Sequence, residues 1–157
     1  RDHNSDTKVL STETGHAKNY SRDPYGAYNP ASGYYASENL LFPPLSEDDL
    51  FHPKTVVMGA RTPAGAVAFR KDALRTQQVV TGDLGGTPVL AVFDPRYDTG
   101  YVYENPDSTE FDAAGGAIAA PDGTSYQPDE LPLSRIHTFD AMWFAWSGYY
   151  PETTVYG

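Results

Sequence analysis

Hydrophobic residues recur in short runs from residue 55 onward, and turn-forming residues bound each run. The runs are TVVMGAR, GAVAFRK, QQVVTG, PVLAVFD and GYVYEN, each of them rich in Val, Phe or Tyr. Glycine, proline, aspartate and asparagine cluster between them, so that the strands recur about every 8–12 residues. This pattern predicts a mainly β domain, a small antiparallel barrel or sandwich, over residues 51–157.

Two stretches predict particular elements of this domain. PVLAVF at residues 88–93 is apolar at nearly every position, which indicates a central strand covered on both faces. The DLGG sequence at 83–86 predicts a tight hairpin, because its glycines can adopt positive φ. A second hairpin is predicted around residues 121–123, within GGAIAAPDGTSY.

The segment TFDAMWFAWSGYY predicts one short helix near the C-terminus. Thr138 can cap its start, Asp140 suits its first turn, and Gly148 can end it. Its apolar side chains surround the helix almost completely, so the helix is expected to be buried or covered by another element. It leads into a final strand at residues 153–156.

Residues 18–50 differ from the rest, because tyrosine, proline and turn dipeptides interrupt any hydrophobic period. We expect an extended N-terminal arm there. Before the arm, SDTKVL at residues 5–10 has the same pattern as PETTVY at 151–156: an acid, Thr, a polar residue, Val and a large apolar residue. Residues 1–17 are therefore interpreted as the closing strand of a preceding repeat.

Acidic residues outnumber basic ones 21 to 11, which gives a formal net charge of −10. Four explanations stay open: calcium binding, a basic partner, simple solubility, or a halophilic surface whose carboxylates stay hydrated while molar salt screens their repulsion. The halophilic explanation is preferred. Nucleic acid is not an expected partner, since no basic stripe is present to neutralise phosphates. The chain has no cysteine, which excludes disulfides and thiolate chemistry, and no apolar run approaches the length of a transmembrane segment.

Four stretches resemble a known family: NYSRDPYGAY, FPPLSEDDLFHPKTVVMG, VVTGDLGGTPVLAVF and MWFAWSGYYPETTVYG. The chain resembles the C-terminal half of domain of unknown function 3179, found in bacteria and halophilic archaea. The resemblance implies two tandem related halves in an exported or membrane-anchored protein. Many members carry Cys-Pro-x-Cys after the central strand of the first half. Here that place reads FDPRYDTG, so the resemblance implies no thiol or soft-metal chemistry in this half.

Asp94, Asp98 and His52 are the candidate metal ligands, because oxygen-rich sites suit a hard cation such as calcium. The alternative is a solvated turn with a packing histidine, and the spacing matches no standard calcium loop. Tyr97, His137, Trp143 and Trp146 are candidates for a ligand or partner surface. With Tyr149 and Tyr150, the two tryptophans form a candidate platform for stacking sugars, although core and rim packing is the more frequent explanation of such residues.

No catalytic set is predicted, since neither a nucleophile elbow nor a phosphate loop occurs. The sequence therefore predicts a secreted or cell-surface structural or binding module. Its expected partner is its own N-terminal half or another protein chain, joined when residues 7–10 add to a sheet edge. Two alternatives remain: the non-catalytic half of an enzyme or metal-handling protein, and a carbohydrate-binding module.

Overall fold

A computed structural model describes residues 8, 11–22 and 33–157, and the chain forms two compact units, residues 1–39 and 40–157. The described part of the first unit contains a short 3₁₀ helix, η1 (Tyr34–Ala36). Apart from Lys8, the strand predicted at residues 7–10 lies outside the described residues. The segment boundaries 1–17, 18–50 and 51–157 stay predictions.

The second unit is built from three sheets. The first sheet has the strand order β10-β1-β2-β11, with β10 (Thr138–Met142), β1 (Val56–Thr62), β2 (Gly65–Arg70) and β11 (Thr154–Tyr156). The second sheet has the order β3-β4-β5-β9, with β3 (Val79–Leu84), β4 (Thr87–Asp94), β5 (Thr99–Glu104) and β9 (Arg135–Ile136). The third has the order β6-β7-β8, with β6 (Asp112–Ala114), β7 (Ala117–Ala119) and β8 (Ser125–Tyr126).

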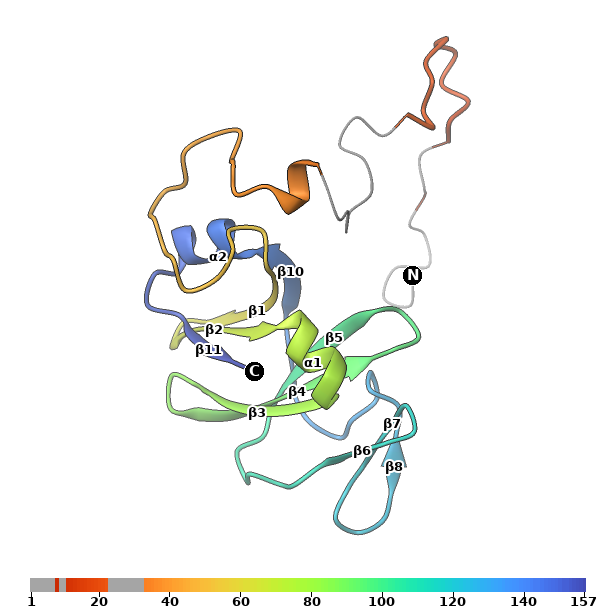
Figure 1. Cartoon of the computed structure of the whole chain (residues 1–157). Helices are drawn as coiled ribbons and strands as arrows, with labels where there is room; N and C mark the ends of the chain where they lie inside the picture. Colours follow the sequence, from red (N-terminus) through yellow and green to blue (C-terminus); the bar gives the residue numbers. More distant parts are fainter. Residues whose placement is uncertain (1–7, 9–10, 23–32) are drawn as a thin grey trace. The chain divides into compact units, whose positions relative to one another are not determined.

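The three sheets and helix α2 (Trp143–Tyr149) form successive layers, which can be followed in Figure 1. Alternate residues of β4 face opposite layers: Leu90 and Val92 pack toward the third sheet, while Val89, Ala91 and Phe93 pack toward the first. The other face of the first sheet packs against α2. The period of two in β-strands explains this arrangement, because both central sheets must bury both of their faces.

The mainly β prediction is confirmed, and the sheets are sandwich-like, with no closed barrel in the described part of the chain. β4 is buried from Val89 to Asp94 and has β3 and β5 on its two sides, as a central strand requires. The DLGG hairpin is also confirmed, because Gly85 and Gly86 adopt φ of 61° and 90° in the β3–β4 turn. The hairpin at 121–123 is confirmed by the pairing of β7 with β8.

The predicted start of the C-terminal helix was wrong. Thr138 and Asp140 belong to strand β10, whose residues pair with β1, and the helix α2 begins only at Trp143. Gly148 lies inside the helix, which ends at Tyr149. The reason is tertiary: β10 gains backbone hydrogen bonds from a strand far away in the sequence, and that pairing outweighs the local capping pattern.

A second helix, α1 (Lys71–Gln77), was not predicted. Its residues are mostly good helix formers, but only Lys71 and Leu74 are buried, so no apolar period marks it. Asp72 favours its first turn, and Gln78 ends it in the left-handed conformation with φ of 63°. The helix connects the first sheet to the second (Figure 1), and its Leu74 packs in the core between them.

Candidate functional site

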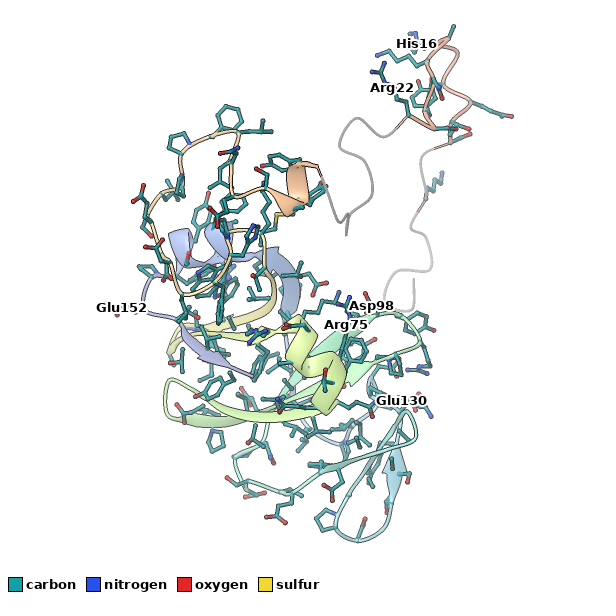
Figure 2. All side chains as sticks on the ribbon, viewed as in Figure 1. His16, Arg22, Arg75, Asp98, Glu130 and Glu152 are labelled. Atoms are coloured by element: carbon teal, nitrogen blue, oxygen red, sulfur yellow. The ribbon has the colours of Figure 1, made fainter. Side chains whose placement is uncertain are left out.

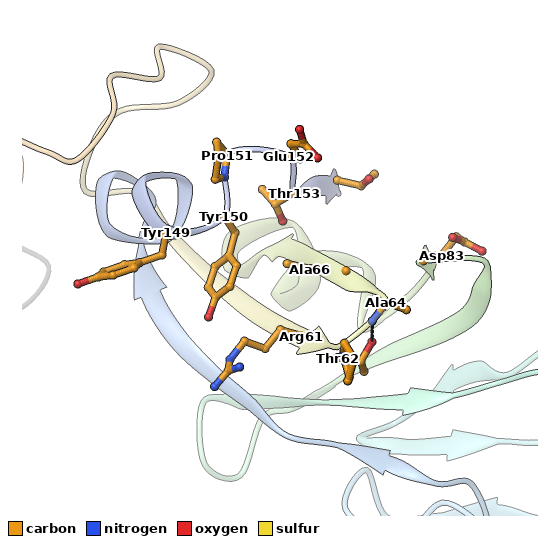
Figure 3. A pocket seen from close by; sticks show the side chains of 14 residues that line it. Arg61, Thr62, Ala64, Ala66, Asp83, Tyr149, Tyr150, Pro151, Glu152 and Thr153 are labelled. Atoms are coloured by element: carbon orange, nitrogen blue, oxygen red, sulfur yellow. Dashed lines mark hydrogen bonds between the residues drawn. The ribbon is translucent and has the colours of Figure 1, made fainter.

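A groove of about 660 Å³ lies where three connections of the second unit meet. The β1–β2 turn, the β3–β4 turn and the segment from the end of α2 to β11 form its walls (Figure 3). Figure 3 shows Tyr149, Tyr150 and Arg61 toward one end, and Asp83 at the other. Its volume falls in the range of small-ligand sites, which is roughly 300–1,000 Å³.

Close approach of two turns forms one wall of the groove. A Cβ atom built on Gly85 would lie 2.5 Å from the carbonyl oxygen of Ala64, so only glycine allows this contact. The Asp83 carboxylate accepts a hydrogen bond from the amide of Gly86 at 2.8 Å and so caps its own turn. The backbone of this wall is therefore held in one conformation.

The opposite wall is fixed through α2. The Tyr150 ring lies 4.4 Å from the Trp146 ring, centroid to centroid, and its amide donates to the Trp146 carbonyl at 2.9 Å. The Trp146 indole, which is almost fully buried, donates to the Thr153 hydroxyl at 3.0 Å. These contacts join the end of the helix to the following loop, so Tyr150 is positioned by the core.

The β4–β5 turn holds the two candidate carboxylates, but each is bound to a different arginine. Asp94 is fully buried, and its two oxygens accept from the Arg96 guanidinium at 2.9 and 2.7 Å. Arg96 also donates to Asp129 at 2.6 Å. The hydrogen bonds from Arg96 lower the pKa of Asp94 below its usual range, against the opposing effect of burial.

Asp98 lies at the other end of this turn with φ of 50°, and Figure 2 shows it beside Arg75. The Arg75 guanidinium donates to both its oxygens, at 2.7 and 2.6 Å, and thereby lowers the pKa of Asp98. Lys71 lies 3.7 Å from Asp98 and donates to Asp140 on β10. This network links α1 to the β4–β5 turn and to the edge of the first sheet.

His52 does not join these carboxylates. Its Nδ1 accepts a hydrogen bond from the Lys54 amide at 3.2 Å, and its carbonyl accepts from the Thr55 amide at 2.8 Å, within its own turn. Within the residues that the structure describes, no group of three His, Asp or Glu side chains is placed to hold a metal. A cation at Asp94 and Asp98 would have to displace arginine from both carboxylates. Calcium binding there stays a prediction.

The four residues expected on a ligand or partner surface lie in different environments. Trp143 and Trp146 are 1% and 2% exposed, with their indoles bonded to Asp48 and Thr153, so both contribute to the layer between α2 and the first sheet. His137 is exposed near the ring of Phe139. Tyr97 is 68% exposed in the β4–β5 turn, with the Arg96 guanidinium over its ring.

Arg61 is a groove residue that the sequence reasoning missed. It lies at the end of β1 beside the TPAG turn, which carries no ligand motif. The sequence predicted the hairpin at residues 83–86, but the contact of that turn with the β1–β2 turn depends on how the first and second sheets stack. Sequence spacing alone contains no signal for that contact.

Within the described ranges, no helix is both long and apolar enough to cross a membrane. A family model described as a protein of unknown function, DUF3179, matches residues 1–153. No curated protein and no solved structure matches the chain. The match covers nearly the whole chain and confirms the resemblance seen in the sequence, but its description assigns no activity.

Proposed function

The chain belongs to the DUF3179 family of proteins of unknown function, and we propose that it is a binding module that joins a partner by sharing a β-strand. The partner is a second sheet of the same type as the first sheet, in its own N-terminal half or in another protein chain. The observation that carries this proposal is the way β11 completes the first sheet.

Strand β11 adds to β2 in parallel, with Val155 opposite Ala68 and Tyr156 opposite Phe69. Val155 packs toward α2, while Tyr156 packs into the core between the first and second sheets. The acidic, Thr, polar, Val, large-apolar pattern of residues 152–156 recurs at residues 6–10. In this chain, however, β2 already has β1 on one side and β11 on the other. Residues 6–10 therefore need a different acceptor, which is an equivalent of β2 elsewhere.

Strand addition suits this role because backbone hydrogen bonds supply affinity, while the alternating side chains supply specificity. In the parallel arrangement Val9 would occupy the place of Val155, and Leu10 the place of Tyr156. The partner would have to offer a pocket for each of them. The binding module is thus specific for sheets built like its own.

A peptide-exchange experiment tests the proposal. The variant Val155→Asp weakens the attachment of β11, because it places a charge in the apolar layer under α2. We expect peptides of residues 150–157 and 3–12 both to bind this variant and to protect the amides of β2 from hydrogen exchange. The unmodified chain, whose β2 edge is occupied, should bind neither peptide.

Matched peptides provide the control: Val155→Asp in the first and Val9→Asp in the second should abolish binding. If the 150–157 peptide binds and the 3–12 peptide does not, residues 6–10 are not equivalent to β11 and the proposal fails. It fails equally if neither peptide protects β2, since the edge would then not accept strands.

We also propose that the module is exported or displayed at the cell surface and is adapted to high salt. The net charge of −10 and an isoelectric point of about 4.6 support the salt adaptation, and the family resemblance is the reason for proposing export. Screening of that self-repulsion should raise stability as salt increases. Thermal unfolding in 0.1 and 2 M KCl measures this effect, and an unfolding temperature that does not rise with salt would contradict the adaptation.

A further inference from the structure

We propose that the groove beside Arg61 binds an acidic oligosaccharide, with a sugar carboxylate on the Arg61 guanidinium and a sugar ring against Tyr150. This site adjoins the β2–β11 edge, but its occupation does not require the strand sharing proposed above. The carbohydrate alternative drawn from the sequence relied on Trp143 and Trp146, but both indoles lie in the core. The geometry points instead to Tyr149 and Tyr150 at the end of α2.

The first argument is the state of Arg61. Within residues 40–157, Arg70, Arg75 and Arg96 each form an ion pair with an aspartate. Arg135 stacks on Tyr101, with its guanidinium carbon 4.1 Å from the ring centroid. Arg61, in the same fully described range, is exposed and has neither kind of partner. A guanidinium without a carboxylate partner, in a chain of net charge −10, is available for the carboxylate of a ligand.

The second argument is the rigidity of the aromatic wall. Tyr150 rests on the buried Trp146, and Figure 3 shows its ring at the same end of the groove as Arg61. Tyr149, which is 72% exposed, borders that end. A tyrosine held by the core offers a flat apolar surface at little entropic cost, which is what the C–H face of a sugar ring requires.

The third argument is the distribution of acceptors. Asp83 and Glu152 also line the groove, and Figure 3 shows Asp83 at the end opposite Arg61. Sugar hydroxyls are donors that need such acceptors, so a chain of sugars can place its carboxylate on Arg61 and its hydroxyls toward the acids. A ligand that carries a carboxylate, hydroxyls and a ring face therefore uses all three features of the groove.

The test uses the full chain and two matched probes, a trisaccharide of one terminal galacturonic acid and two galactose units, and the neutral galactose trisaccharide. Amide chemical shifts are followed by NMR as each probe is added at low millimolar concentration. We expect the acidic probe to shift groove amides, including those of the non-proline residues in 61–66 and 149–154. The neutral probe should bind at least about tenfold more weakly, because the charged hydrogen bonds are lost.

Three variants locate the site. Arg61→Gln should weaken the acidic probe at least about tenfold and leave the neutral probe unchanged. Tyr150→Leu keeps an apolar contact with Trp146 but removes the flat ring, so it should weaken both probes. Arg135→Gln, an exposed arginine outside the groove, is the control and should change neither.

Four results would overturn the proposal: no binding of the acidic probe, equal binding of the two probes, shifts outside the groove, or unchanged binding in Arg61→Gln. Because Arg61 is exposed, its variant is expected to fold, and the unperturbed part of its NMR spectrum shows whether it has done so. Binding of the oligosaccharide does not require that β2 accept the peptides tested under the proposed function. Either proposal can therefore fail while the other holds.

Discussion

The first and second sheets have the same number of strands but are assembled from the chain in opposite ways. In the second sheet β3, β4 and β5 are consecutive, and tight turns join them. In the first sheet only β1 and β2 are consecutive. Val56 pairs with Met142 at one edge, and Phe69 pairs with Tyr156 at the other.

This difference shows where the molecule depends on distant contacts. Three of the four strands of the second sheet can form from local hairpins, with β9 added at one edge, whereas the first sheet cannot be complete until the C-terminal segment has returned to both its edges. Strand β11, whose pattern residues 6–10 repeat, and one wall of the groove both belong to this returning segment. Changes in the first sheet should therefore affect binding and stability together, while changes in the β4–β5 turn should affect stability alone.

The largest expected effect tests the contact between the first sheet and α2. A Cβ atom built on Gly59 would lie 2.1 Å from a ring carbon of Trp146. Gly59→Ala should therefore displace the indole and lower the free energy of unfolding by about 3 kcal/mol, as expected for overpacking. Urea denaturation measures the loss, and hydrogen exchange should show it chiefly in β1, β2 and β10.

Gly148→Ala is the matched control, since a Cβ atom there meets only ordinary contacts, the nearest at 3.4 Å from Leu45. Because Gly148 lies inside α2, this variant should be as stable as the unmodified chain or more stable by up to about 1 kcal/mol. If Gly59→Ala and Gly148→Ala lowered the free energy of unfolding equally, close packing of α2 on the first sheet would not be the cause of the loss.

The next effect tests the second sheet. Asp94→Asn removes the fully buried carboxylate that forms an ion pair with Arg96 in the β4–β5 turn. Because Arg96 is 40% exposed and keeps Asp129, we expect a loss of about 2 kcal/mol in the free energy of unfolding. Peptide exchange at β2 should be unchanged, and a change there would contradict the independence of the two sheets.

The same variant tests the pH dependence. The folded pKa of Asp94 is lowered by Arg96, so the unfolded chain takes up this proton first as the pH falls. The stabilisation is complete above the ordinary aspartate pKa of about 3.9 and is lost as the pH falls through the lower, folded value. Stability of the unmodified chain should fall below about pH 4 more steeply than that of Asp94→Asn. Parallel slopes would contradict this assignment.

A smaller effect tests how β11 is held. The Tyr156 hydroxyl accepts from the Asp83 amide at 2.9 Å and lies 3.3 Å from the Asp83 carbonyl, so it links β11 to β3. Tyr156→Phe keeps the ring against Phe69 and Gly82 and removes only these bonds. We expect a loss of about 1 kcal/mol and faster hydrogen exchange at the end of β2. Exchange that accelerates throughout the second sheet would contradict a role limited to this edge.

The smallest effect is expected at the exposed end of the β4–β5 turn. The Asp98 side chain is 58% exposed, so its pair with Arg75 should contribute less than about 1 kcal/mol. Asn also tolerates the positive φ of this position. Asp98→Asn should thus shift the urea midpoint only slightly. A loss as large as that of Asp94→Asn would show that burial is not what distinguishes the two carboxylates.

Elements that depend on residues close together in the sequence could be predicted, and elements that depend on distant residues could not. PVLAVF and DLGG were interpreted correctly because burial on two faces and positive φ at glycine leave direct marks in a short stretch. Thr138 was misassigned because its partner, Ala60 on β1, is distant in the sequence. Helix α1 was missed because a seven-residue helix with one buried apolar side chain leaves no periodic pattern.

The sequence by itself determined the β class of the domain, its hairpins, its acidic charge and its family, because each depends on composition or on neighbouring residues. The tertiary structure decided which tryptophans are buried, which carboxylates are paired and which turns meet around Arg61. Those outcomes depend on the stacking of two sheets and on the return of the C-terminal strand, and they involve residues whose spacing along the chain has no fixed period.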